Sequence, residues 1–126
     1  MKKFEFKRPV EEIEIAGDIY TIDLSDVSIQ TKQKRFETFQ EEARKIPRDD
    51  TEYFDKALKL VEDTIDTIFH PGAFKVIYEK SGKSLYNMTD LVEYLADVIN
   101  EKAKKQHDER VNIYLKKRDR KNHGKN

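Results

Sequence analysis

The residues closest to a known chemical motif are Gly82-Lys83-Ser84, a triplet of the kind that ends a phosphate-binding loop. Such a loop needs an earlier glycine, five positions before the second one, with a strand before the loop and a helix after it. Ile77 stands where that earlier glycine would be, and the residues before the triplet have a helical pattern. The triplet therefore predicts a turn and not a nucleotide site.

Three histidines, His70, His107 and His123, could bind a metal or transfer a proton. No two of them have the three- or four-residue spacing that places metal ligands on one face of a helix. His70 directly precedes Pro71 at a predicted helix end, where an imidazole suits the negative end of the helix dipole. We expect His70 to cap or pack, and we expect no metal site.

Acidic residues are numerous and include Glu62, Asp63 and Asp66. Paired carboxylates can hydrolyse glycosides or bind calcium, but these three are spread over the polar side of a predicted helix, as on a solvated face. The chain has no cysteine, and no serine stands in a nucleophile-elbow pattern. The sequence predicts a protein that is not an enzyme and that binds neither a metal nor a cofactor.

The composition favours a folded domain with a strongly charged surface. Charged residues make up 40% of the 126 residues, against roughly 25% in an average soluble protein. The apolar residues nevertheless fall in periodic blocks up to about residue 99, which indicates a core rather than disorder. No apolar run approaches the ~18 residues of a membrane span, and the N-terminus lacks the apolar stretch of a secretory signal. We expect a cytoplasmic protein without membrane contact.

The formal net charge is zero, but the charges are unevenly distributed. Residues 101–126 carry ten Lys or Arg and four Asp or Glu, whereas residues 1–100 carry 15 and 21. This split predicts either an interaction arm or an electrostatic contact between neighbouring copies of the chain. We therefore divide the chain into one α+β domain over residues 1–100 and a charged helical extension with a basic tail over residues 101–126.

Two runs near the N-terminus alternate apolar and polar residues. The runs 13–15 and 20–24 flank a turn at Gly17, which predicts an antiparallel β-hairpin with one apolar face. Phe4 and Phe6 show the same alternation, so the predicted β element begins at residue 4 and has two to three strands. A hairpin alone is marginally stable in water. It must therefore pack on the helices or pair with another strand.

Helical periodicity fills the rest of the predicted domain. We expect helices at about 27–45 and 51–69, a short helical segment at 72–78, and a last helix that begins near Asn87 or Thr89 and stays apolar to Ile99. The apolar stripe of the second helix is the clearest helical signal in the chain. The predicted fold class is α+β, with an N-terminal antiparallel β-hairpin followed by a four-helix, mainly α domain.

Aromatic residues gather around the break between the second helix and the last one. Core packing between helices would account for them, and so would an apolar groove that takes a partner helix or peptide. Both interpretations stay open at the level of sequence. As a hypothesis, the partner-binding patch consists of Phe69, Phe74, Ile77, Tyr78, Leu85 and Tyr86.

The order of these features resembles the small tail assembly chaperones of long-tailed phages and prophages of Gram-positive bacteria. The resemblance covers about residues 4–100 and rests on IEIAGDIYTIDLSD and on FHPGAFKVIYEKSGKSLYNMTDLVEYLADVINE, which match in residue type and order. It implies a non-catalytic protein that binds the helical tape measure protein in the host cytoplasm and is absent from the finished virion. Some of those chaperones are extended by translational frameshifting. Residues 101–126 depart most from the pattern.

Two other functions stay open. The basic tail would suit a small regulatory or nucleic-acid-binding phage protein, although acids interrupt it and no aromatic stacking platform accompanies it. A structural virion component, such as a connector or a tube subunit, is the third function. We expect the tape measure protein as the partner, a homo-oligomer as a further state, and nucleic acid as a less favoured ligand.

Overall fold

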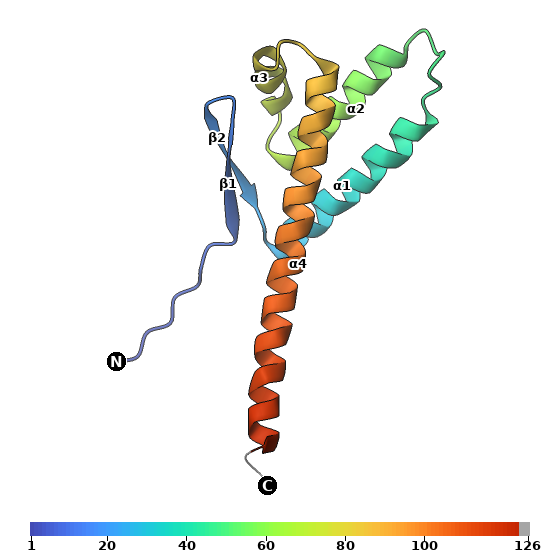
Figure 1. Cartoon of the computed structure of the whole chain (residues 1–126). Coiled ribbons are helices and arrows are strands. Elements are labelled where there is room, and N and C mark those ends of the chain that lie inside the picture. The colour runs from blue at the N-terminus through green and yellow to red at the C-terminus, as the bar shows by residue number, and fades with distance from the viewer. Residues whose placement is uncertain (124–126) are drawn as a thin grey trace.

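The computed structural model describes the backbone of residues 1–123, with the side chains of that range apart from residues 109, 110, 113 and 118–123. Its elements are β1 (Val10–Ile15), β2 (Asp18–Asp23), α1 (Asp26–Lys45), α2 (Tyr53–Ile68), α3 (Ala73–Lys80) and α4 (Leu85–His123). The hairpin lies beside the helices, and α4 crosses them and projects beyond every other element (Figure 1). The predicted α+β fold, a hairpin followed by four helices, is confirmed for the described residues.

The hairpin has the register that its alternating sequence predicts. Ile13 lies opposite Tyr20 in an antiparallel pair, and both Ile13 and Ile22 are buried on the inner face. Ala16 and Gly17 form a two-residue turn, with φ of 49° and 90°. Positive φ at both positions gives a turn whose twist matches that of the two strands. The apolar inner face therefore points at the helices.

The β element is shorter than predicted, because Phe4 and Phe6 lie outside it. Residues 1–9 form no strand, and the two phenylalanine rings contact each other with centroids 4.9 Å apart. They are 79% and 90% exposed. A strand needs backbone partners on a neighbouring strand, and the pairing with β2 begins only at Val10. The alternation of apolar and charged residues around Phe4 and Phe6 does not by itself provide a neighbouring strand.

One apolar core joins the hairpin to all four helices. Its buried members recur at three- and four-residue intervals along α2 and α4, as expected for amphipathic helices. They are Ile13, Ile22, Leu24, Ile29, Phe36, Val61, Ile65, Ile68, Ala73, Phe74, Ile77, Met88, Val92, Leu95 and Ile99. Ala103 is the last apolar residue of α4, among those whose side chains are described, that packs against this core. The remainder of α4 therefore runs on beyond the apolar centre of the molecule.

Polar contacts fasten the outer elements to one another. The Lys102 ammonium lies 3.6 Å from the Glu11 carboxylate, which links α4 to β1. Lys80 of α3 pairs with Asp18 at the start of β2. The Gln33 amide of α1 donates a hydrogen bond to the Asn100 side chain of α4 at 3.0 Å. These contacts connect segments far apart in sequence.

The last helix begins earlier than predicted and continues through most of the charged C-terminal segment. It begins at Leu85 rather than at Asn87 or Thr89, because the Ser84 hydroxyl accepts a hydrogen bond from the Asn87 backbone N–H at 3.1 Å and caps the first turn. Within residues 101–126, for which the sequence predicts a charged helical extension and a basic tail, the helix runs to residue 123. No proline or glycine interrupts it there. Residues 124–126 of the predicted tail lie outside the described part of the chain.

Candidate functional site

The six residues predicted as a partner-binding patch are divided between the core and the surface. Phe74 and Ile77 are buried, with exposed fractions of 5% and 3%, whereas Tyr86 is 76% exposed. The other three, which pack against the edge of the core, are Phe69, Tyr78 and Leu85. The six therefore do not form one exposed patch. Core packing was one of the two interpretations that the sequence left open. Phe74 and Ile77 are core residues, in agreement with that interpretation.

The aromatic rings of this group join the hairpin to the helices. The Phe69 ring, after α2, contacts the Tyr20 ring of β2 with centroids 4.9 Å apart. Within α3, the Phe74 and Tyr78 rings stack with centroids 5.1 Å apart and an interplanar angle of 14°. Burying rings of this size contributes much of the stability of a small core. Their clustering in the sequence reflects this structural junction.

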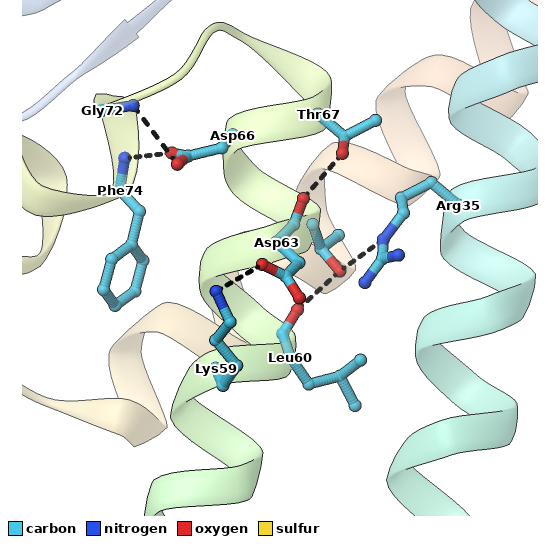
Figure 2. A network of polar contacts seen from close by, with 9 residues as sticks. Arg35, Lys59, Leu60, Asp63, Asp66, Thr67, Gly72 and Phe74 are labelled. Carbon is cyan, nitrogen blue, oxygen red and sulfur yellow. Dashed lines mark hydrogen bonds and ion pairs between the residues drawn. The ribbon is translucent and has the colours of Figure 1, made fainter.

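A carboxylate on α2 sets the position of α3. Asp66 accepts hydrogen bonds from the backbone N–H groups of Gly72, at 3.2 Å, and Phe74, at 2.8 Å (Figure 2). These N–H groups belong to the first turn of α3, where no helical carbonyl is available to them. Gly72 adopts φ of 91°, a conformation that favours glycine. Asp66 is therefore a structural cap.

The other residues considered for chemistry, the Gly82-Lys83-Ser84 triplet and His70, lie in a turn and at a helix end. Gly82-Lys83-Ser84 forms the turn between α3 and α4, as predicted. The His70 Nδ1 atom lies 3.1 Å from the Pro71 carbonyl oxygen, next to the end of α2. Among the described residues, no group of three His, Asp or Glu side chains is placed to hold a metal ion.

A cleft between α1 and α2 is the concave feature best suited to a macromolecular ligand. It has a cavity volume of about 620 Å³, and the two helices lie on the side of the molecule away from the hairpin (Figure 1). Its lining residues recur every three or four positions, so each helix contributes one face. We call this site the α1–α2 cleft; it is lined by Arg35, Thr38, Glu42, Ile46, Glu52, Asp55, Lys56, Lys59, Leu60 and Asp63.

A hydrogen-bonded bridge holds the two walls of the cleft together. The Arg35 Nε group of α1 donates to the Thr64 hydroxyl of α2 at 3.3 Å. That hydroxyl donates in turn to the Leu60 carbonyl oxygen at 2.9 Å (Figure 2). Thr64 is fully buried, and a buried hydroxyl needs such partners. The bridge fixes the relative position of the two helices.

Charges of both signs line the cleft around a narrow apolar strip. Lys56 lies 2.7 Å from Asp50, and Lys59 lies 3.1 Å from Asp63. A hydrogen bond from each ammonium to its carboxylate raises the pKa of Lys56 and of Lys59, so both remain charged. The half-buried side chains of Ile46 and Leu60 supply the apolar contact. The arrangement suits a helix with a thin apolar stripe between mixed charges.

Sequence reasoning missed the α1–α2 cleft because its lining residues have the composition of a solvated face. The sequence places Asp63 on a solvated face, and the structure agrees, because Asp63 is exposed. The three- and four-residue spacing of Arg35, Thr38 and Glu42 was the available signal. That spacing shows only that the residues share a face of α1. Which face of α2 lies beside it depends on the packing of the helices.

The comparisons with known proteins give one result that bears on the whole fold. The model of a family of unknown function, DUF6673, matches residues 12–125, which include most of β1 and begin before every helix. No curated protein and no solved structure matches the chain. In the described part of the chain, no helix combines the length and apolar character needed to cross a membrane.

Proposed function

We propose that this chain, which belongs to the family of unknown function DUF6673, is a non-catalytic tail assembly chaperone of a long-tailed phage or prophage. In this role it binds an amphipathic helix of the tape measure protein in the bacterial cytoplasm, before the tail is complete. The observation that carries the proposal is the α1–α2 cleft, a cavity of about 620 Å³ lined by one face of each of two packed helices. The sequence resemblance to tail assembly chaperones is the reason for proposing the tape measure protein as the partner.

The lining of the α1–α2 cleft suits a helical ligand. Helices pack with their axes about 8–10 Å apart, through side chains spaced three or four residues along each helix. Thr38 and Glu42 on α1 have this spacing, as do Lys56 and Lys59 on α2. Leu60 and Ile46 would contact the apolar stripe of the ligand, while the charged side chains pair with its flanks. A third helix would complete a three-helix arrangement.

The same lining favours reversible binding. Much of the cleft surface belongs to charged side chains already paired with a neighbour, such as Lys59 with Asp63. A ligand must compete with these pairs, and surface ion pairs contribute little to affinity. Weak binding suits a chaperone, because the tube protein has to displace it from the tape measure protein. Several chaperone copies on one long helical protein would hold it by multivalency.

A chaperone is needed because the tape measure protein is long and helical. Amphipathic helices that expose their apolar faces before assembly associate with each other and aggregate. A carrier with a highly charged surface keeps such helices in solution. Charged residues make up 40% of this chain, which agrees with that role.

Nucleic-acid binding by the end of α4 is a second candidate function. Lys104, Lys105, Lys116 and Lys117 are exposed along this helix, and lysines bind phosphates. Such binding would weaken steeply with salt and would be lost on removal of residues 101–126. Binding of a helix in the α1–α2 cleft would survive that truncation, which separates the two functions.

The proposal is tested by capture of a tape measure fragment from the same phage genome. The wild-type chain should retain the co-expressed fragment on affinity resin, and Leu60→Lys should lose most of it because a charge replaces the apolar contact. Val76→Lys is the matched control, since Val76 is a half-exposed aliphatic residue of α3 outside the cleft. Circular dichroism checks that both variants are folded. Absence of capture by the wild type, or equal capture by Leu60→Lys, contradicts the proposal.

A further inference from the structure

The C-terminal half of α4 is a helix that stands away from the body. Among the described side chains, Ala103 is the last apolar residue of α4 that packs on the core, yet the helix continues to residue 123 and projects alone (Figure 1). Its described side chains there include three exposed apolar ones, Val111 at 40%, Tyr114 at 65% and Leu115 at 46%. A helix that projects without tertiary contacts lacks the packing that supplies most of the stability of helices in proteins. One that also exposes apolar residues is expected to pack against a partner.

The charges of α4 are segregated along its length. From Leu85 to Glu101 the helix has four acidic residues and no Lys or Arg, whereas residues 102–126 have ten Lys or Arg and three acidic residues. Two parallel α4 helices would place like charges side by side. Two antiparallel helices would place the acidic half of each against the basic half of the other, which is the charge-complementary arrangement.

One uninterrupted face of α4 is free for such a contact. Its members follow each other at intervals of three or four residues and so lie on one side of the helix. All of them are exposed, in contrast to the core-facing side that carries Met88, Val92 and Leu95. We call this side the outer face; it consists of Tyr86, Asp90, Glu93, Asp97, Glu101, Lys104, Asp108, Val111 and Leu115.

We propose that two copies of this chain associate through the outer faces of α4, antiparallel, with the two-fold axis between Asn100 and Glu101. This register places Tyr86 opposite the partner's Leu115, so that apolar side chains meet at both ends of the interface. It places Asp97 opposite the partner's Lys104, near the centre. Two-fold symmetry makes each of these contacts twice.

The same register contains two kinds of unfavourable contact. The Glu101 side chains of the two copies face each other across the two-fold axis, and a second like-charge contact provides a test in the opposite direction. Glu93 lies opposite the partner's Asp108, and like charges repel. Asp108→Lys should therefore strengthen the dimer, whereas most substitutions in an interface weaken it. This interface does not include the α1–α2 cleft. It is measured on the chain alone, so its failure is distinguishable from failure of the proposed chaperone function.

Analytical ultracentrifugation of charge variants tests the pairing. Asp97→Lys should raise the dimer dissociation constant by on the order of tenfold, because two attractive pairs become two repulsive ones. Combining Asp97→Lys with Lys104→Asp should restore it, and Asp108→Lys should lower it. A wild-type chain that is monomeric at all concentrations at low salt, or a dissociation constant unchanged by Asp97→Lys, overturns the proposal.

Disulfide trapping tests the register, because the wild-type chain has no cysteine. Glu101→Cys places the two thiols on either side of the two-fold axis, so oxidation should give a covalent dimer. Leu115→Cys is the matched control, since the helical rise of ~1.5 Å per residue puts its two thiols about 43 Å apart in this register. Covalent dimers from both variants would indicate a parallel pair. That outcome, or no covalent dimer from Glu101→Cys, contradicts the proposal.

Discussion

The Asp66 carboxylate of α2 accepts a hydrogen bond from the backbone N–H of Phe74, 2.8 Å away, in the first turn of α3. The same carboxylate accepts a second hydrogen bond from the Gly72 N–H at 3.2 Å. One acidic side chain of α2 thus holds the turn that leads into α3. It also places the Phe74 ring in the core, where it is 5% exposed.

Removal of this cap should weaken the fold. Asp66→Ala leaves two N–H groups without their acceptor and should lower the free energy of unfolding by about 1 kcal/mol, as for other helix caps. Urea denaturation followed by circular dichroism measures the change. Asp63→Ala is the control, because Asp63 is exposed and pairs only at the surface with Lys59. Equal effects of the two substitutions would show that Asp66 does not cap α3.

Truncation of two members of the predicted partner-binding patch should change stability by very different amounts. Phe74→Ala removes a buried ring and should destabilise the chain by about 3–5 kcal/mol. Tyr86→Ala removes a side chain that is 76% exposed and should change the stability of the monomer, at protein concentrations too low for dimers, by no more than about 0.5 kcal/mol. Thermal and urea unfolding of both variants measure this contrast. A small effect at Phe74 would contradict its assignment to the core.

The hairpin turn should accept a stabilising substitution. Ala16 has φ of 49°, a left-handed conformation that favours asparagine or glycine over alanine. Ala16→Asn should therefore raise the free energy of unfolding by up to about 1 kcal/mol. Gly17→Ala is the companion change; its new methyl group would meet no atom within 4 Å, so any loss of stability comes from the backbone. A stability decrease in Ala16→Asn would contradict this turn geometry.

Lys32 should make stability depend on pH in the alkaline range. Its side chain is 6% exposed, and its ammonium donates to the Asp23 carbonyl oxygen at 3.2 Å and to the Ser28 hydroxyl. Burial lowers the pKa of Lys32 below the ordinary 10.5, although the nearby Asp23 charge opposes the shift. Between the lowered pKa and 10.5 the unfolded chain binds more protons than the folded chain. The free energy of unfolding contributed by Lys32 therefore rises with pH in that window.

The comparison of wild type with Lys32→Met isolates this effect. The wild type should gain stability relative to the variant as the pH rises through the window below 10.5. Urea titrations at a series of pH values measure the difference. A difference that stays constant or falls with rising pH would contradict the inferred shift in the pKa of Lys32.

Local sequence patterns were sufficient for the fold class. Ile13 and Ile22 were identified on the inner face by alternation, and the stripe from Val61 to Ile68 marked α2 by its spacing, because both signals depend on neighbours in sequence. The pattern failed at Phe4 and Phe6, which alternate in the same way but have no strand to pair with. Pairing depends on a partner strand, and a single run of residues does not specify one.

The candidate site was less predictable, because it also depends on which segments pack together and not on local sequence alone. Aromatic side chains suit a core and a binding surface equally well, so residue type could not separate Phe74 from Tyr86. The α1–α2 cleft was missed because Arg35 and Lys59 each have the character of a solvated face. Only the packing of α1 against α2 brings the two faces together. The basic excess of residues 101–126 over residues 1–100, in contrast, was already visible in the sequence.

Hydrogen–deuterium exchange of the chain, alone and with a helical fragment of the tape measure protein, tests the proposed chaperone function most directly. Binding in the α1–α2 cleft predicts slower exchange in residues 35–46 and 52–63, which line the cleft, and unchanged exchange in α3. Absence of protection at a saturating concentration of the fragment would contradict the proposed function. Protection confined to α3 and the start of α4 would contradict the cleft as its site.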